Sequence, residues 1–260
     1  MPTHQIDGLD IHFVQGGPQD AAKRVLYVHG TGCNAGVWAR HCESLPPDCR
    51  YVCVDLAGHG RSGGAGFRGT ADHAFVIEGL VEHLDWDRFV IVGHSLGGAI
   101  ALTYAVYHPN RLAAMVLVDT GGRLRVAPDV LEAARLAASG VEVPPLDRRW
   151  TYSPRTPDTV IDQVYRDLGD VSPELVYRDW IADDSFDFLS RLWAVRTPCL
   201  AVCGADDPIT PVRNHTFFQR SMPSCELAII EDSGHWPFYE QPESFDRIVV
   251  DYLDGVYGSE

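Results

Sequence analysis

Short, nearly continuous apolar runs recur along the chain, each bounded by glycine or aspartate. Such runs are typical of strands that are covered on both faces, as in a parallel sheet. They occupy residues 25–29, 51–55, 89–93, 115–119, 199–203 and 227–230. The pattern therefore predicts a mostly parallel sheet built from these segments.

Segments with helical periodicity lie between these runs, at residues 71–84, 96–108, 212–221 and 242–253. Alternation of strands and helices is typical of an α/β fold with helices on both faces of the sheet. Residues 6–14, with Gly8 at a turn, predict an antiparallel hairpin at the sheet edge.

The alternation is interrupted between residues 121 and 195. This stretch holds helical patterns at 128–139, 157–168 and 173–182, separated by proline-rich connectors and without a strand pattern. We therefore expect one core domain formed by residues 1–120 and 196–260, with a helical cap, residues 121–195, inserted between two strands.

The composition is that of an ordinary globular protein, with 260 residues, 45% hydrophobic and 22% charged. A net charge of −15, from 21 Lys+Arg against 36 Asp+Glu, opposes binding to nucleic acid or to an anionic membrane surface. No stretch is long and apolar enough to span a bilayer, and the first residues lack the basic and apolar regions of a signal peptide. We expect a cytoplasmic protein that binds neither nucleic acid nor membrane.

The 7 cysteines are scattered without the paired spacings of zinc sites, and the 11 histidines include no HExxH motif. Free cysteine commonly behaves as a small buried hydrophobe. We expect no metal and no cofactor.

The first chemical signal is Gly93-His-Ser-Leu-Gly97, which directly follows one apolar run and directly precedes a helical segment. A nucleophile elbow needs this arrangement, because glycine on both sides lets the strand turn sharply and leaves Ser95 strained and exposed. A serine hydroxyl also needs a base that removes its proton and a carboxylate that orients the base. His235 follows the last predicted strand, and Asp206 and Asp207 follow the one before it.

In these motifs and in their order along the chain, the sequence resembles the α/β-hydrolase superfamily nearly throughout, outside the cap. The family's other motifs are matched by an oxyanion loop at 29–32, a D-x-x-G-x-G-x-S turn at 55–62, an acid loop at 204–211 and a histidine loop at 234–243.

This resemblance implies that Ser95 is the nucleophile, His235 the base and Asp207 the acid. In the family's acid loop the carboxylate lies three positions after glycine and four before proline, which selects Asp207 over Asp206. Some members carry the acid at the position of Asp119, which stays an alternative.

Two amide donors are needed to stabilise the oxyanion of a tetrahedral intermediate. We expect them to be the backbone N–H groups of Leu96, at a helix N-terminus, and of Thr31, or of Gly32 if the loop turns differently.

Further residues are expected to form the walls of the site. His94 adjoins the nucleophile, but on a sharp turn its side chain points away from Ser95; His59, between two glycines, is interpreted as structural. One or two cap aromatics should line an apolar pocket for the acyl group. The residues predicted to contact substrate are Gly32, His94, Trp150, Trp180 and Trp236.

A serine at the elbow favours acyl chemistry over the alkyl-enzyme chemistry of superfamily members that carry aspartate there. The leading interpretation is a hydrolase of small-molecule carboxylic esters. An alternative is a hydrolase of an enol-lactone or of a C–C bond in a meta-cleavage diketone, because Trp236 follows the base as in the enzymes of that kind. A non-catalytic receptor on the same fold is a third possibility, since fold does not fix function. The sequence does not determine the substrate or the oligomeric state.

The cap also carries a group of basic residues, Arg123, Arg125, Arg148, Arg149 and Arg155, in an otherwise acidic chain. They either pair with surface carboxylates or offer one guanidinium to a substrate carboxylate. The second possibility would favour the enol-lactone or diketone substrates, which carry free carboxylates.

Overall fold

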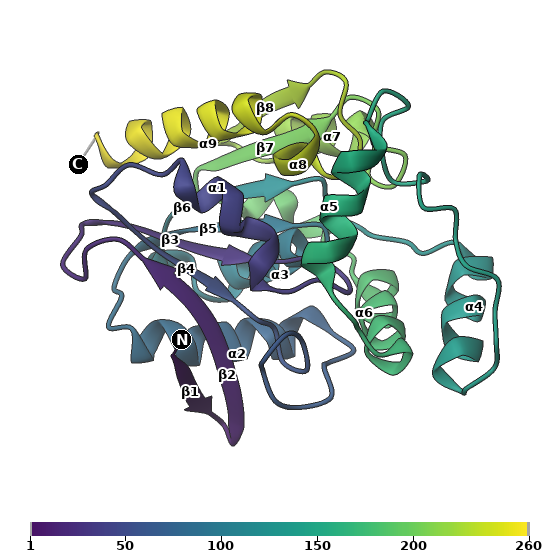
Figure 1. The fold of residues 1–260 in the computed structure, drawn as a ribbon. Coiled ribbons are helices and arrows are strands. Elements are labelled where there is room, and N and C mark those ends of the chain that lie inside the picture. The colour runs from purple at the N-terminus through teal and green to yellow at the C-terminus, as the bar shows by residue number, and fades with distance from the viewer. Residues whose placement is uncertain (1, 259–260) are drawn as a thin grey trace.

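The computed structural model describes residues 2–258. Its centre is an eight-stranded sheet with the strand order β1-β2-β4-β3-β5-β6-β7-β8 (Figure 1). The strands are β1(Thr3–Ile6), β2(Leu9–Gly16), β3(Lys23–Val28), β4(Cys49–Val54), β5(Phe89–His94), β6(Leu112–Val118), β7(Cys199–Gly204) and β8(Cys225–Ile230). Strands β3 to β8 are parallel, which confirms the predicted fold class.

The hairpin β1–β2 forms the edge of the sheet, and β2 pairs antiparallel with β4. Its two-residue turn consists of Asp7 and Gly8, which both have positive φ, 48° and 79°. A tight turn of this kind needs positive φ at both central positions, which is why aspartate-glycine occurs there.

The two faces of the sheet carry separate apolar cores, because alternate residues of each strand point in opposite directions. Leu26 and Val28 of β3 pack with helices α2(Thr70–His83), α3(Leu96–Tyr107) and α7(Val212–Ser221). Val25 and Tyr27 pack on the other face with residues of η1(Ala35–Trp38), α1(Ala39–Glu43) and α9(Pro242–Tyr257). Helices therefore cover both faces, as the continuous apolar runs predicted.

The chain between β6 and β7 forms α4(Pro128–Ala138), α5(Asp158–Leu168), α6(Pro173–Ser185) and η3(Leu189–Ala194), to one side of the sheet (Figure 1). Helix α5 packs on η1 and α8(Pro237–Glu240), and α6 packs on α3 and α4. Because η1, α3 and α8 follow the carboxyl ends of β3, β5 and β8, this helical insertion lies over that edge of the sheet.

Some short elements escaped the sequence pattern, namely η1, α1, η2(Pro109–Arg111), η3 and α8. Each is six residues long or less, too short to show helical periodicity. No helix among residues 2–258 combines the length and the apolar character needed to cross a bilayer.

Candidate active site

Ser95 lies in the sharp turn that joins β5 to α3, with φ 54° and ψ −117°. Positive φ is rare for residues other than glycine, asparagine and aspartate, and it marks local backbone strain. The turn is held by the Ser95 amide, which donates to the carbonyl of Val118 at 3.0 Å, and by the Thr120 hydroxyl, which donates to the Ser95 carbonyl at 2.8 Å. The Ser95 side chain is partly exposed, as the elbow predicts.

Gly93 and Gly97 are required by close packing of the backbone. A Cβ on Gly93 would stand 2.2 Å from the Gly97 carbonyl oxygen, and a Cβ on Gly97 would stand 2.3 Å from that of Val28. Neither position tolerates a side chain without movement of the strand or the helix.

The loop after β3 lies directly against the elbow. A Cβ on Gly30 would stand 3.0 Å from Cβ of Ser95, so glycine is what allows this approach. Within residues 2–258, the amides of Thr31 and Leu96 donate no hydrogen bond to the protein. The Gly32 amide does donate, at 2.9 Å, to Oδ2 of Asp179 on helix α6. Of the two loop amides that the sequence left open, Thr31 is thus the available donor.

His235 and Asp207 form a buried pair at the ends of β8 and β7. Nδ1 of His235 lies 2.9 Å from Oδ2 of Asp207, and this carboxylate also accepts the Thr210 hydroxyl at 2.6 Å and the Ile209 amide at 2.8 Å. Burial alone would raise the pKa of Asp207, but the charge of His235 and these hydrogen bonds outweigh it and lower the pKa below its ordinary value. Asp207 is therefore ionised at neutral pH.

The two other carboxylates considered from the sequence have different partners. Asp206 is exposed and accepts the hydroxyl of Ser153 from the insertion at 2.6 Å. Asp119 is fully buried, and its Oδ1 accepts the Gly204 amide at 2.9 Å. Burial, reinforced by the charge of Asp207, raises the pKa of Asp119 well above its ordinary value, whereas the pKa of Asp207 is lowered. The structure thus pairs His235 with Asp207.

The histidine loop is held by a residue whose role the sequence did not reveal. The carboxylate of buried Glu240 accepts the amides of Gly234 and Trp236 at 3.0 Å each, and the amide of Ser153 at 2.9 Å. Glu240 thus ties His235 and the insertion together.

His94 is hydrogen-bonded to the backbone of His235. Its Nε2 donates to the carbonyl oxygen of His235 at 2.8 Å, and the side chain is buried beside the rings of His235 and Trp236. Burial, with a contribution from His235, lowers the pKa of His94 to about 3. The neutral imidazole therefore holds the backbone of His235, and its contact with substrate stays a prediction.

The predicted tryptophans occupy different surroundings. Trp236 is buried, and its indole N–H donates to the Thr151 hydroxyl at 3.0 Å. Trp150 and Trp180 are half-buried in the insertion. Their contact with substrate stays a prediction, as does that of Trp236.

The arginine group does not reach the site. All five guanidinium groups lie on the surface, paired with exposed or half-exposed carboxylates. The pairs are Arg123 and Arg125 with Asp187, Arg148 with Asp162, Arg149 with Asp158, and Arg155 with Asp232. This arrangement favours surface pairing and leaves the substrate-carboxylate hypothesis without support from these residues.

Two sets of three side chains bring atoms that could bind a metal within 4.8 Å of one another. The first set is Asp119, Asp207 and His235, and the second is Asp119, Cys203 and His215. The first contains the hydrogen-bonded pair of His235 and Asp207. In the second, the Cys203 thiol donates to the Gly204 carbonyl, and Nε2 of His215 accepts the Thr120 amide. Most of these atoms are thus engaged within the protein, whereas Oδ2 of Asp119 and Nδ1 of His215 are buried without a hydrogen-bond partner.

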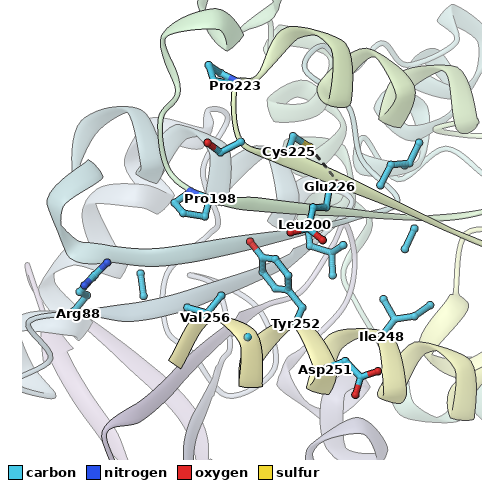
Figure 2. A pocket seen from close by; sticks show the side chains of 15 residues that line it. Arg88, Pro198, Leu200, Pro223, Cys225, Glu226, Ile248, Asp251, Tyr252 and Val256 are labelled. Carbon is cyan, nitrogen blue, oxygen red and sulfur yellow. Dashed lines mark hydrogen bonds between the residues drawn. The ribbon is translucent and has the colours of Figure 1, made fainter. Parts of the chain in front are cut away.

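A cavity of about 1130 Å³ lies away from these residues, between β8 and α9 (Figure 2). Its walls include Pro198 and Pro223 before β7 and β8, together with Tyr252 and Val256 of α9. These residues lie toward the amino ends of the strands, whereas Ser95, Asp207 and His235 follow the carboxyl ends. The cavity is thus separate from the candidate site.

Comparison with known proteins shows which family the chain resembles. The model of the alpha/beta hydrolase family matches residues 25–248. A pimeloyl-[acyl-carrier protein] methyl ester esterase of Neisseria meningitidis is 28% identical over 91% of this chain and 95% of its own. A 2-hydroxy-6-oxononadienedioate/2-hydroxy-6-oxononatrienedioate hydrolase of Cupriavidus pinatubonensis is 27% identical over 89% of this chain and 87% of its own.

Among solved structures, a thermophilic esterase from Thermogutta terrifontis, with malate bound, has a TM-score of 0.85 at 27% identity and covers 98% of this chain and 97% of that one. The relatives are thus hydrolases of ester and related bonds.

Proposed function

Because the chain belongs to the alpha/beta hydrolase family, we propose that it is a serine hydrolase that cleaves carboxylic esters of small molecules through an acyl-enzyme. The observation that supports this proposal most is the strained turn at Ser95, at the same edge of the sheet as the buried pair of His235 and Asp207. Strain of this kind persists where the surrounding structure enforces it, commonly at active sites.

In the acylation step, Ser95 Oγ attacks the ester carbonyl carbon while its proton passes to Nε2 of His235. The carbonyl oxygen becomes an oxyanion, held by the amides of Thr31 and Leu96. His235 then gives its proton to the ester oxygen, the bond between that oxygen and the carbonyl carbon breaks, and the alcohol leaves.

In the deacylation step, a water molecule gives a proton to His235 and adds to the acyl carbon. The bond to Ser95 Oγ breaks, the acid leaves, and the proton returns to Ser95. Asp207 stays ionised throughout, keeps the Nδ1–H tautomer of His235 and stabilises the imidazolium.

A second candidate is the hydrolysis of an enol-lactone or of a C–C bond in a meta-cleavage diketone. Two observations favour it, the Cupriavidus relative and the tryptophan that follows His235. The sequence Thr31-Gly32-Cys33 and His94 before the serine differ from the glycine-proline-glycine loop and the asparagine typical of those enzymes. Ester hydrolysis is therefore the first proposal.

A fluorophosphonate probe tests the nucleophile. We expect stoichiometric labelling of the wild type, and S95A should lose the label and about 10³-fold or more of kcat while its circular dichroism spectrum is unchanged. S139A, which removes an exposed hydroxyl at the end of α4, is the control and should label and turn over normally. A folded S95A variant with most of its esterase activity would contradict the assignment.

The reaction class is tested with p-nitrophenyl esters of increasing chain length, a lactone and a meta-cleavage product. Turnover of the esters with the highest kcat/KM supports the first proposal, and preference for the meta-cleavage product supports the second. Binding without turnover of any of them would point to a receptor.

A further inference from the structure

Helix α6 presents two buried carboxyl groups to the loop that follows β3. Asp179 and Asp183 are four residues apart, so they lie on the same helix face. Oδ2 of Asp183 accepts the Thr31 hydroxyl at 2.7 Å, and Oδ2 of Asp179 accepts the Gly32 amide at 2.9 Å. Two acidic groups from the insertion thus hold the side chain of one loop residue and the backbone of the next.

Asp179 is hydrogen-bonded to a buried histidine. Nε2 of His59 lies 2.9 Å from Oδ2 of Asp179, and its Nδ1 lies 3.2 Å from the Ala57 carbonyl oxygen. When Asp179 is ionised both neighbours are acceptors, so both ring nitrogens carry a proton and the ring is an imidazolium. Burial lowers the pKa of His59, but the hydrogen bond and charge of Asp179 outweigh it and leave the pKa raised. Together the two side chains are neutral.

Asp183 has no cation of its own among the described residues. Its Oδ1 is buried without a hydrogen-bond partner, and burial raises the pKa of this carboxyl to about 8. The Thr31 hydroxyl lowers this pKa, and the charges of Asp179 and Asp184 on the same helix raise it. Below about pH 8, Asp183 is therefore neutral.

The helices packed on α6 leave this balance unchanged. Helix α3 carries no charged side chain. On α4, Arg135 is engaged on the surface by Glu132 at 2.7 Å.

We propose that Asp179 and Asp183 are positioning residues, which fix the loop at residues 30–32 so that the Thr31 amide faces the oxyanion. The inference rests on the proposed hydrolase function. The other groups here are already bonded: the Gly32 amide and the Thr31 hydroxyl donate to Asp179 and Asp183, and the Gly30 carbonyl accepts the amide of Cys33, the next residue. The Thr31 amide is left to stabilise the negative charge that develops on the substrate.

The charge state of the cluster has a consequence for catalysis. While Asp183 is protonated, the cluster carries no net charge, because the hydrogen-bonded pair of His59 and Asp179 is neutral as a whole, so it does not oppose the oxyanion. Once Asp183 ionises, a second negative charge stands within hydrogen-bond distance of the Thr31 side chain. Like charges in a site with little water repel strongly, so the transition state is destabilised more than the binding of a neutral ester.

The test is the pH dependence of kcat and KM for a neutral p-nitrophenyl ester, measured from pH 6 to 10 on the whole protein. We expect wild-type kcat to fall about tenfold for each pH unit above about 8, with a smaller change in KM. D183N keeps an acceptor oxygen for the Thr31 hydroxyl but cannot ionise, so this decline should disappear. T31V removes the hydrogen bond that lowers the pKa of Asp183 and should move the decline to higher pH.

D184N is the matched control. Asp184 is the next residue of α6, and its Oδ1 accepts the Val126 amide at 3.2 Å, remote from the loop. D184N should keep the wild-type decline of kcat, with at most a small shift to lower pH, because the charge of Asp184 raises the pKa of Asp183. D179N should lose at least tenfold in kcat at every pH.

A second measurement does not depend on activity. Carbon-13 NMR of labelled aspartate carboxyls should show one group that titrates near pH 8 and is missing from D183N. A wild-type kcat that stays level through pH 9, a decline that D183N retains, or an Asp183 resonance that titrates near 4 would each overturn the inference. Failure of the proposed function differs visibly, because the wild type would then neither label with fluorophosphonate nor turn over esters.

Discussion

Replacement of Asp207 by asparagine should reveal how far the reaction depends on this carboxylate. Its two oxygens have different partners, since Oδ1 accepts the Ile209 amide, and Oδ2 accepts the Thr210 hydroxyl and faces Nδ1 of His235. In D207N one of the two positions becomes an NH₂ group, and the neighbours decide which.

An NH₂ group at the Oδ1 position would face the Ile209 amide, and two buried donors would then oppose each other. Leaving a buried donor unsatisfied costs about 1–3 kcal/mol. At the Oδ2 position the NH₂ group can donate to His235 and to the Thr210 hydroxyl, which can reverse its own hydrogen bond. The second orientation is therefore favoured, and it forces the proton of His235 onto Nε2, where it blocks removal of the Ser95 proton.

D207N also removes the negative charge that stabilises the imidazolium. In serine hydrolases with this arrangement, the same substitution lowers kcat by about 10⁴-fold, which corresponds to about 5.5 kcal/mol in activation free energy. We expect a loss of this size, because Asp207 is only 3% exposed and water cannot replace it.

The assay compares kcat for a p-nitrophenyl ester in D207N, D206N and D119N, with circular dichroism as the check on folding. D206N should change kcat less than about twofold, since Asp206 is exposed and an amide oxygen can still accept the Ser153 hydroxyl. D119N should lose less than about tenfold, because an amide oxygen can still accept the Gly204 amide and Asp119 does not face His235 in a hydrogen bond. Equal losses in all three variants, or the largest loss in D206N or D119N, would refute the assignment of Asp207.

Three further predictions concern stability and the arginine group. The folded-state pKa of Asp183, about 8, lies above its ordinary value of about 3.9, so the folded protein binds one more proton than the unfolded chain between these pH values and loses about 1.4 kcal/mol of stability per pH unit as the pH rises. In urea unfolding from pH 5 to 8, the free energy of unfolding of D183N should therefore rise relative to that of the wild type. A difference that stays constant with pH would contradict this. G97A should lower the free energy of unfolding by about 1–3 kcal/mol, because its Cβ would stand 2.3 Å from the Val28 carbonyl oxygen. G255A in α9 should raise the free energy of unfolding, because a Cβ there meets nothing within 4 Å and alanine favours the helix. Equal effects of the two substitutions in urea unfolding would contradict the packing argument. Replacement of any one of the five cap arginines by alanine should change kcat/KM by less than about twofold, both for an ester with a terminal carboxylate and for its methyl-ester analogue. The reason is that exposed ion pairs contribute little. A selective loss with the carboxylate substrate in any one variant would restore the hypothesis that an arginine binds a substrate carboxylate.

The sequence by itself determined the features that depend on neighbouring residues. Continuous apolar runs predicted β3 to β8. For β5, β6 and β7 the reason is that a strand buried on both faces needs apolar side chains at successive positions, whereas the edge strand β8 is largely half-buried or exposed. The elbow was visible for a similar reason, since Gly93 and Gly97 lie within two positions of Ser95 and each meets backbone atoms where a side chain would stand. The hairpin followed from Asp7 and Gly8, whose backbone conformation few other residues adopt.

The choice among carboxylates was only partly determined by the sequence. Two adjacent aspartates followed β7, and the residues alone left them open until the resemblance to a family selected one. In the structure, the side chains of Asp206 and Asp207 bond to different partners, the first to Ser153 of the insertion and the second to His235. Their order along the chain carries no information about that difference.

Only the tertiary structure decided which groups from distant segments meet. Asp179 and Asp183 lie 147 and 152 positions from the loop residues they bind, and the helix predicted at 173–182 included Asp179 but ended one residue before Asp183. The signal was present as two acids on the buried face of α6, beside Leu175 and Ala182. Periodicity reports the burial of a face but not its partner, because the partner is set by how α6 docks over the sheet, and docking sums many contacts that no local stretch of sequence contains.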